Sequence, residues 1–234
     1  LTSVECCLLI DEAAVTIVAG NIRRSAGMRQ FAADDDAASS AKDNLWQQDD
    51  QGNWRIDPER DALRMANHTR VYHTRPSREV VLAAVTKQFH SGEGAIQFAP
   101  EAIARSNSDL LSTAELRQEF IEIYCDQGRD EAGRWLQTNH GPISAAELEH
   151  RLSRYGLNPC GEILGADFHC NLAEIHLNQI DPSDEEGQAE AFRAAALSVA
   201  CLLNHRFEVE RYRQSREWDP IVGVSFTGLF DFFV

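Results

Sequence analysis

The alternation of helical patterns with short, uninterrupted apolar strands is the feature that most constrains the fold. The clearest strand is "PIVGVSF", residues 220–226, where apolar residues follow one another without polar alternation. A strand of this kind suits a parallel sheet that is covered on both faces. Helical patterns occupy residues 3–20, 77–88, 112–128, 129–138, 144–156 and 183–203. The alternation predicts an α/β fold and argues against a helical bundle or an all-β sandwich.

A polar excursion interrupts this pattern at about residues 33–57, which are rich in Asp, Gln and Ser. Within it, "DDQGN" lies between Trp46 and Trp54 and predicts the turn of a small hairpin. The pair Asp57-Pro58 predicts a helix start, with Asp as the N-cap and Pro at the first helical position, and a helix that runs to about residue 67. The stretch "TRVYHTRP", residues 69–76, is expected to be extended.

Net charge and hydropathy exclude two classes of partner. The 234 residues carry a formal net charge of −15, with a sequence pI near 4.9. An acidic chain gains no counterion-release affinity for DNA or RNA, so we expect no polymeric nucleic acid partner. A small phosphorylated ligand can still bind in a local basic pocket. No apolar run approaches the roughly 20 residues that span a bilayer, so no membrane partner is expected either.

Cysteine usage indicates a reducing compartment. The chain is too long for a small disulfide framework and its start has no basic region of a signal peptide, so we expect reduced thiols and a cytoplasmic location. Neither CxxC nor HxxxH occurs, so no metal site is predicted. Cys201 falls within the helical pattern at 183–203 and is expected on a buried face. The six cysteines are Cys6, Cys7, Cys125, Cys160, Cys170 and Cys201.

Both ends of the sequence favour an internal piece of a longer protein. The first residue is leucine, and the last segment, "DPIVGVSFTGLFDFFV", is the most apolar stretch and has no polar cap. We therefore expect residues 1–234 to form one partial domain, with N-terminal and C-terminal parts of the full protein missing.

The stretch "NPCGEI", residues 158–163, is the strongest candidate for chemistry. Pro159 fixes its own φ and biases Asn158 towards an extended conformation, while Gly161 permits a tight bend. This backbone predicts a stiff loop that presents Cys160 and Glu162. A free cysteine is most often a small buried hydrophobe, so that interpretation of Cys160 stays open. Glu162 is suited to act as a general base, whereas none of the eight histidines can be paired with Cys160 from sequence.

Three blocks in this order resemble the large subunits of ribonucleotide reductases. They are "IVAGNIRRSA" at 17–26, "NPCGE" followed by "CNLAEIHLN" at 158–178, and "DPIVGVSFTGLFDF" at 219–232. Together with "LRMANHTRVYH" at 63–73, their wording is most similar to the adenosylcobalamin-dependent class, and within it to the monomeric ribonucleoside-triphosphate reductases. The resemblance implies part of a ten-stranded α/β barrel with a central finger loop.

The resemblance also implies roles for the residues of the loop. Cys160 would become a thiyl radical after homolysis of the cobalt–carbon bond of adenosylcobalamin, and would take the 3′ hydrogen of the ribose. Glu162 would remove the proton of the 3′-hydroxyl, and the 2′-hydroxyl would leave as water. Asn158 would hydrogen-bond the substrate hydroxyls. A stiff loop inside a barrel fits this chemistry because it holds the radical close to a C–H bond and excludes water.

Cys170 would be one half of the dithiol that reduces the substrate radical, if the resemblance holds; a core cysteine is the alternative. No cysteine here matches its partner, which we expect outside this sequence, together with the cysteine pair that takes electrons from thioredoxin.

The segment that contains Gly20, Asn21, Arg23, Arg24 and Ser25 would belong to the loop that links a deoxynucleotide effector site to the substrate base. A solvated basic pair is the alternative for the two arginines. Coupling of this kind requires a segment with two arrangements that both ligands bias.

Three other functions remain open at this point. The first is a ribonucleotide reductase that uses a diiron or dimanganese subunit as its radical source. The second is a glycyl radical enzyme, which also carries a finger-loop cysteine. The third is a non-catalytic nucleotide-binding module, for which replacement of Cys160 would change nothing. The sequence separates these from the cobalamin-dependent class by resemblance alone.

Overall fold

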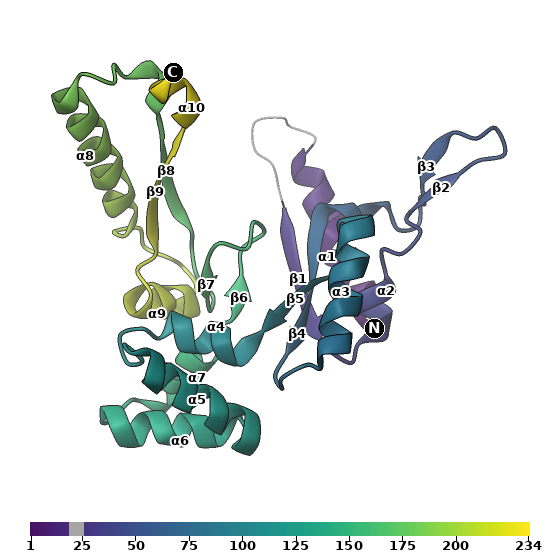
Figure 1. Cartoon of the computed structure of the whole chain (residues 1–234), viewed down its shortest axis with the longest axis horizontal. Helices are drawn as coiled ribbons and strands as arrows, with labels where there is room; N and C mark the ends of the chain where they lie inside the picture. The colour runs from purple at the N-terminus through teal and green to yellow at the C-terminus, as the bar shows by residue number, and fades with distance from the viewer. Residues whose placement is uncertain (19–25) are drawn as a thin grey trace. The chain divides into compact units, whose positions relative to one another are not determined.

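A computed structural model describes residues 1–18 and 26–234 of the chain (Figure 1). The predicted effector-loop residues Gly20, Asn21, Arg23, Arg24 and Ser25 lie outside the described residues. The chain divides into two compact units, residues 1–164 and 165–234, and each unit is described by itself. No helix in the described ranges is both long and apolar enough to cross a membrane.

A three-stranded parallel sheet forms the centre of the first unit. Its strands are β1 (Gly27–Ala32), β4 (Ala66–Tyr72) and β5 (Ala95–Phe98), in the order β1-β4-β5. Gly27 pairs with Ala66 and Thr69 with Ala95, so all three strands begin near one edge of the sheet. The prediction of a mixed α/β fold is confirmed. Among the described residues the sheets are small and none closes into a barrel.

Helices cover one face of this sheet. They are α1 (Ser3–Val18), α2 (Asp36–Ser40) and α3 (Arg78–Ser91), which contact β1, β4 and β5 respectively. Alternate residues of a strand point to opposite faces, so the contacts of one residue identify the face of its neighbours. Arg29 pairs with the fully buried Asp11 of α1. Burial raises the pKa of Asp11, and the Arg29 guanidinium opposes that rise.

His68 of β4 lies on this helix-covered face and is 6% exposed. Its ring contacts the Phe31 ring edge to face, with 5.9 Å between centroids. Burial lowers the pKa of His68 to about 4; the Lys42 ammonium acts in the same direction and the Glu93 carboxylate opposes it. His68 in the folded chain therefore stays neutral near pH 6.5, where a histidine of the unfolded chain binds a proton.

Acid is expected to destabilise the first unit through His68. The lowered pKa of His68 stabilises the fold above pH 6.5, and this contribution is lost as the pH falls towards 4, because the unfolded state then binds a proton that the folded state does not. Between pH 8 and pH 5 the loss is about 2 kcal/mol. Urea unfolding at a series of pH values measures it. His68→Gln should flatten the curve over this range, and an equally steep curve for the variant would contradict the assignment.

The hairpin predicted within the polar excursion is present, but the helix predicted after it is not. Strands β2 (Trp46–Gln48) and β3 (Trp54–Ile56) pair antiparallel around the "DDQGN" turn. The predicted helix at 57–67 is wrong: a 3-10 helix, η1 (Asp61–Met65), occupies its middle, and β4 begins at residue 66. Pairing with β1 takes the residues from 66 onwards into the sheet, and this overrides the local helix signal.

A helical layer completes the first unit. The predicted start at Ser144 is confirmed, since its hydroxyl accepts a hydrogen bond from the Glu147 N–H. The helix expected from residue 112 begins one residue later, with Thr113 as the N-cap, whose hydroxyl accepts from the Leu116 N–H. Phe120 and Leu136 are fully buried at the centre of this layer. Its helices are α4 (Ala99–Ser106), α5 (Ala114–Gln127), α6 (Arg129–His140) and α7 (Ala145–Leu152).

The second unit is built on two parallel strands, β8 (Asn171–His176) and β9 (Val222–Thr227). Its helices are η2 (Leu177–Gln179), α8 (Glu185–Leu202), α9 (Glu210–Trp218) and α10 (Leu229–Phe233). Helix α8 contacts both strands. The predicted burial of Cys201 is wrong: Val199 is the buried residue of α8 in this structure, and Cys201, two positions on, lies on another side of the helix and is exposed.

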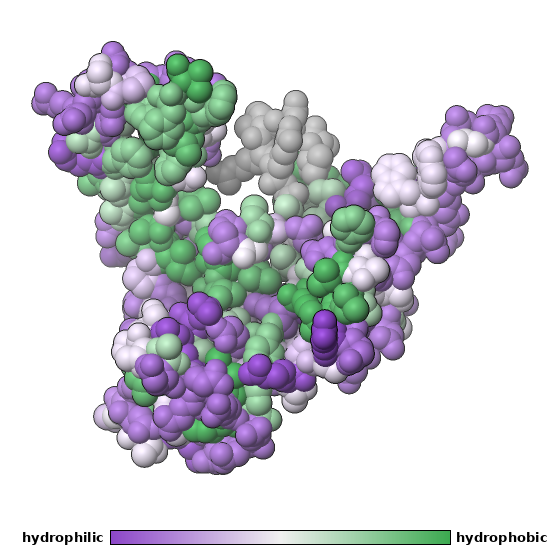
Figure 2. All heavy atoms as spheres, in the orientation of Figure 1, coloured by the Kyte–Doolittle hydropathy of each residue, from purple (hydrophilic) through white to green (hydrophobic). Residues whose placement is uncertain are grey.

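Strand β9 is less covered than its apolar sequence predicts. Val222 and Phe226 are 43% and 46% exposed. Figure 2 shows apolar residues at the surface of this unit. Other exposed apolar side chains of the second unit are Leu172, Phe192, Leu197, Leu202, Val209, Leu229, Phe230, Phe233 and Val234.

Candidate active site

The "NPCGEI" stretch forms a tight loop between two short paired strands, β6 (Gly156–Leu157) and β7 (Leu164–Gly165). Cys160 and Glu162 are exposed, whereas Asn158 is buried. Cys160 is therefore not a core residue in this structure, and its thiol is free. The loop brings together three of the predicted site residues, in the first unit.

The loop closes on itself through its own polar groups. The Gly161 N–H donates to the Asn158 carbonyl oxygen at 3.0 Å, and the Ile163 N–H donates to Asn158 Oδ1 at 3.1 Å. Gly161 has φ +79°, the left-handed conformation that glycine adopts without strain. Pro159 removes a further backbone freedom next to Cys160. The stiffness predicted from the sequence thus has a specific basis in these contacts.

Two glutamines of the sheet hold the strand that leads into the loop. Gln30 Nε2 donates to the Tyr155 carbonyl oxygen at 2.9 Å, and Gln30 Oε1 accepts from the Leu157 N–H at 3.0 Å. Gln97 Nε2 donates to the same Tyr155 oxygen at 2.9 Å, and the two glutamine side chains bond one another at 2.6 Å. Residues 155–157 are therefore fixed to β1 and β5.

A third contact fixes the loop itself. Asn67 Nδ2 of β4 donates to the Pro159 carbonyl oxygen at 2.6 Å, on the residue directly before Cys160. Asn67 precedes His68, so it points to the face opposite α2 and α3. In the first unit, the loop consequently lies over the sheet face that the helices leave open.

A cavity of about 320 Å³ adjoins Cys160. Pro159 and Gly161 line it from the loop, and Met28, Asn67 and Ala95 from the starts of the three strands. Its volume is at the lower end for drug-sized ligands. Adenosylcobalamin is far larger, so the described residues do not by themselves fit that cofactor. Among residues 1–18 and 26–234, no group of His, Cys, Asp and Glu side chains is arranged to hold a metal ion.

Cys170 lies in the second unit, directly before β8, and is exposed. The preceding His169 ring contacts Phe207 and Tyr212, with 4.0 Å and 5.2 Å between ring centroids. The following Asn171 donates through Nδ2 to the Ile221 carbonyl oxygen at 3.2 Å. Both neighbours of Cys170 are thus fixed inside the second unit.

A buried polar cluster supports the approach to β6. Asn107, at the end of α4, donates through Nδ2 to the carbonyl oxygens of Ile103 at 2.8 Å and Arg151 at 3.0 Å. Its Oδ1 accepts from Arg151 at 3.1 Å and from Arg154 at 2.7 Å. Asn107 is fully buried and Arg154 is 3% exposed. The cluster joins α4 to the segment between α7 and the candidate loop.

Sequence reasoning missed Gln30, Asn67 and Gln97. Each is an amide side chain within a strand of a parallel sheet, where apolar residues are the rule. Gln30 and Gln97 are half-buried and Asn67 is exposed. The mismatch is a usable signal for the two half-buried amides, which need hydrogen-bond partners where the sheet withdraws them from water. The partners themselves lie more than 50 residues away along the chain, so the sequence did not identify them.

Gly161→Ala is expected to lower the free energy of unfolding by about 1 kcal/mol, because a Cβ at positive φ is strained. Apart from the two chain neighbours, no residue that the structure describes has an atom within 4 Å of the position that a Cβ would take, so the cost is conformational. Gly52→Ala is the matched control, since Gly52 has φ +81° and equally open surroundings in the β2–β3 turn. Urea unfolding should give similar losses for the two variants. Iodoacetamide labelling of Cys160, read by mass spectrometry, should change for Gly161→Ala alone; equal labelling would contradict the role of Gly161 in the loop.

Comparisons of the chain with models of protein families, with curated proteins and with solved structures found no match.

Proposed function

We propose that this chain carries the radical loop of a ribonucleotide reductase and reduces ribonucleoside triphosphates to 2′-deoxyribonucleoside triphosphates. One observation carries the proposal: an exposed cysteine and an exposed carboxylate, two residues apart, lie in a closed loop fixed over the open face of a parallel sheet. The resemblance of the three sequence blocks supports the same assignment. The loop presents both groups to a ligand without requiring them to move far.

The proposed first step takes a hydrogen atom from the ribose. The Cys160 thiyl radical forms an S–H bond as the 3′ C–H bond breaks, which leaves the unpaired electron on C3′. A reacting pair of this kind must be held at near-contact distance and kept from water. The Asn67 and Gln30 contacts supply that rigidity, because they fix the backbone on the residue before Cys160 and on the strand before the loop.

Glu162 and Asn158 act on the sugar hydroxyls in the proposal. The Glu162 carboxylate accepts the proton of the 3′-hydroxyl, and the 2′-hydroxyl takes up a proton from a thiol of the reducing dithiol and leaves as water. Asn158 Oδ1 is engaged by the Ile163 N–H, so the amide nitrogen is the group that we assign to a substrate hydroxyl. In the proposal, Asn158 thus closes the loop through its amide oxygen and binds the sugar through its amide nitrogen.

The reduction itself needs two electrons, which we assign to a dithiol that includes Cys170. The second thiol of that pair lies outside this sequence in the proposal, and a thioredoxin-type protein reduces the resulting disulfide. Cys170 and Cys160 are both exposed, so a substrate or a reductant can reach them as these roles require. A cytoplasmic location belongs to the same proposal, since thiol cycling needs a reducing compartment.

The radical source, the effector and the complete barrel are also proposed from the resemblance. Adenosylcobalamin would supply the radical chemistry, with most of its site outside the described residues. A deoxynucleotide effector would act through the segment at 20–25. The whole protein would hold the ten-stranded barrel that the resemblance implies, with no polymeric nucleic acid or membrane as partner.

Glu162→Gln tests the proposal in the full-length protein supplied with adenosylcobalamin, thioredoxin and a ribonucleoside triphosphate. Loss of a general base is expected to lower kcat by about 10²–10⁴-fold. Chromatographic measurement of deoxynucleotide gives the rate. Glu59→Gln, at another exposed glutamate of the first unit, should leave kcat unchanged. Wild-type protein that forms no deoxynucleotide with this cofactor, or with a metal-containing subunit in its place, would refute the reductase assignment.

A further inference from the structure

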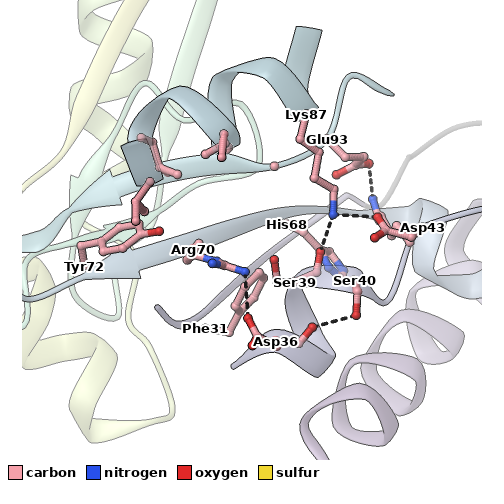
Figure 3. Close-up of a pocket in the computed structure, with 17 residues that line it drawn as sticks. Phe31, Asp36, Ser39, Ser40, Asp43, His68, Arg70, Tyr72, Lys87 and Glu93 are labelled. Carbon is pink, nitrogen blue, oxygen red and sulfur yellow. Dashed lines mark hydrogen bonds and ion pairs between the residues drawn. The ribbon is translucent and has the colours of Figure 1, made fainter. Parts of the chain in front are cut away.

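A second cavity, of about 480 Å³, lies in the first unit on the helix-covered face of the sheet (Figure 3). Strand β4 lines it with His68, Arg70 and Tyr72, α2 and the residues after it line another side, and α3 a third. Val80, Ala83, Ala84 and Ile96 add apolar wall. The volume is within the range of small-molecule sites, and the mixture of apolar wall and few polar groups is typical of them.

Two buried polar atoms in this lining have no hydrogen-bond partner within the described part of the chain. They are His68 Nε2 and the Tyr72 hydroxyl oxygen, on side chains of residues that are 6% and 8% exposed. In Figure 3 the Tyr72 hydroxyl is turned towards the other lining residues. An orphaned buried polar group costs free energy, so two in one cavity point to a ligand that satisfies them.

The tautomer of His68 decides what the ligand must offer. A hydrogen bond with the Ala38 backbone raises the pKa of His68, which means that the ring donates there. The other nitrogen, Nε2, is then an acceptor. The ligand must therefore bring an N–H or O–H donor to His68. The Tyr72 hydroxyl can donate or accept.

The charges of the lining favour a neutral ligand. Each cation already has an acidic partner: Lys42 bonds Glu93 at 2.6 Å and Lys87 bonds Asp43 at 2.7 Å. Arg70 is 3.5 Å from Asp36. With three cations and three acids in pairs, neither an anion nor a cation gains a free counter-charge.

The spacing of the two orphaned groups sets the length of the ligand. His68 and Tyr72 are four residues apart on one strand, so their Cα atoms are about 13 Å apart at the usual rise of a strand. The apolar wall and the Phe31 ring lie in the same lining. An aromatic molecule that is polar at both ends and no longer than this Cα spacing matches the arrangement.

We infer that the cavity between β4 and helices α2 and α3 binds a neutral aromatic molecule with an N–H or O–H donor at the end near His68 and a hydroxyl at the end near Tyr72. The inference uses no residue of the "NPCGEI" loop and goes beyond the proposed reductase activity. His68 also lines the cavity beside Cys160, so the two cavities adjoin at the start of β4.

Tryptophol, which carries an indole N–H and a terminal hydroxyl, is the probe. Calorimetric titration of the chain should show binding that weakens about threefold to tenfold for 3-ethylindole, which lacks the hydroxyl. Indole-3-acetate should also bind more weakly, because its carboxylate meets Asp36, Asp43 and Glu93 without a free cation. Equal affinity for the three probes, or no binding of tryptophol at millimolar concentration, would overturn the inference.

Tyr72→Phe removes one orphaned oxygen and little else. The variant should lose the preference for tryptophol over 3-ethylindole, while Tyr124→Phe, at a buried tyrosine whose hydroxyl is bonded to His73 at 3.0 Å, should retain it. Without ligand, Tyr72→Phe should raise Tm by about 2–4 °C, since it relieves an unsatisfied group, whereas Tyr124→Phe should lower Tm. A lower Tm for Tyr72→Phe, with the preference for tryptophol unchanged, would refute the site.

Cys160→Ser separates this inference from the proposed function. The variant should bind tryptophol with wild-type affinity even where it affects turnover. A lost tryptophol site in Cys160→Ser would place the probe in the cavity beside the loop and contradict the assignment to the helix-covered face.

Discussion

Replacing Cys160 with serine is expected to abolish deoxynucleotide formation in the full-length protein. An O–H bond is much stronger than an S–H bond, so the serine side chain does not form the radical that takes the 3′ hydrogen atom. Serine is close to cysteine in size, and Cys160 is exposed and contributes nothing to the core. The fold should therefore survive the change, and the assay is chromatographic detection of deoxynucleotide after long incubation.

Cys125→Ser is the matched control for this result. Cys125 lies in α5 and packs against the helical core, and burial raises the pKa of its thiol. Its replacement should lower stability slightly and leave turnover intact. Wild-type turnover by Cys160→Ser would refute the radical role, and would favour a chain that binds nucleotides without acting on them.

Asn107→Leu is expected to lower the free energy of unfolding of the first unit by about 3–5 kcal/mol, the largest stability effect that we anticipate. Leucine has the same number of side-chain heavy atoms and the same branch point as asparagine but makes none of its four hydrogen bonds. The change withdraws an acceptor from the Arg154 guanidinium, which is 3% exposed, and donors from two carbonyl oxygens. Urea unfolding followed by circular dichroism measures the loss.

Asn139→Leu makes the same chemical change at the surface. Asn139 is exposed at the end of α6 and bonds the Trp135 carbonyl oxygen of its own helix at 3.0 Å. Its replacement should change the free energy of unfolding by less than about 0.5 kcal/mol. Equal losses for the two variants would show that the Asn107 cluster contributes no more than one surface hydrogen bond.

Local signals predicted the elements whose ends are determined by neighbours in the sequence. Thr113 and Ser144 begin helices because their hydroxyls reach N–H groups three residues away, and the β2–β3 hairpin turns where Asp49 accepts from Gln51 and Asn53. The stiff loop at 158–163 was predictable for the same reason, since its proline, its glycine and the Asn158 contact are local.

Long-range contacts explain what the sequence did not predict. The residues from 66 onwards form a strand, not the end of the expected helix, because β1, about 40 positions earlier, pairs with them. Gln30 and Gln97 fix residues 155–157 from far upstream, and nothing near either glutamine indicates that partner. The exposure of Cys201 depends on which side of α8 meets β8 and β9. Each of these outcomes is decided by tertiary packing, which overrides local propensity.

The neighbouring positions of Asn67 and His68 have a practical consequence for spectroscopy. One side chain reaches the "NPCGEI" loop and the other lines the cavity under α3, on opposite sides of a single strand. The peptide group that joins them is therefore adjacent to both compartments. In a ¹⁵N-labelled sample, the amide resonance of His68 would respond to a molecule arriving from either direction, so one assigned peak would serve as a detector for two separate screens.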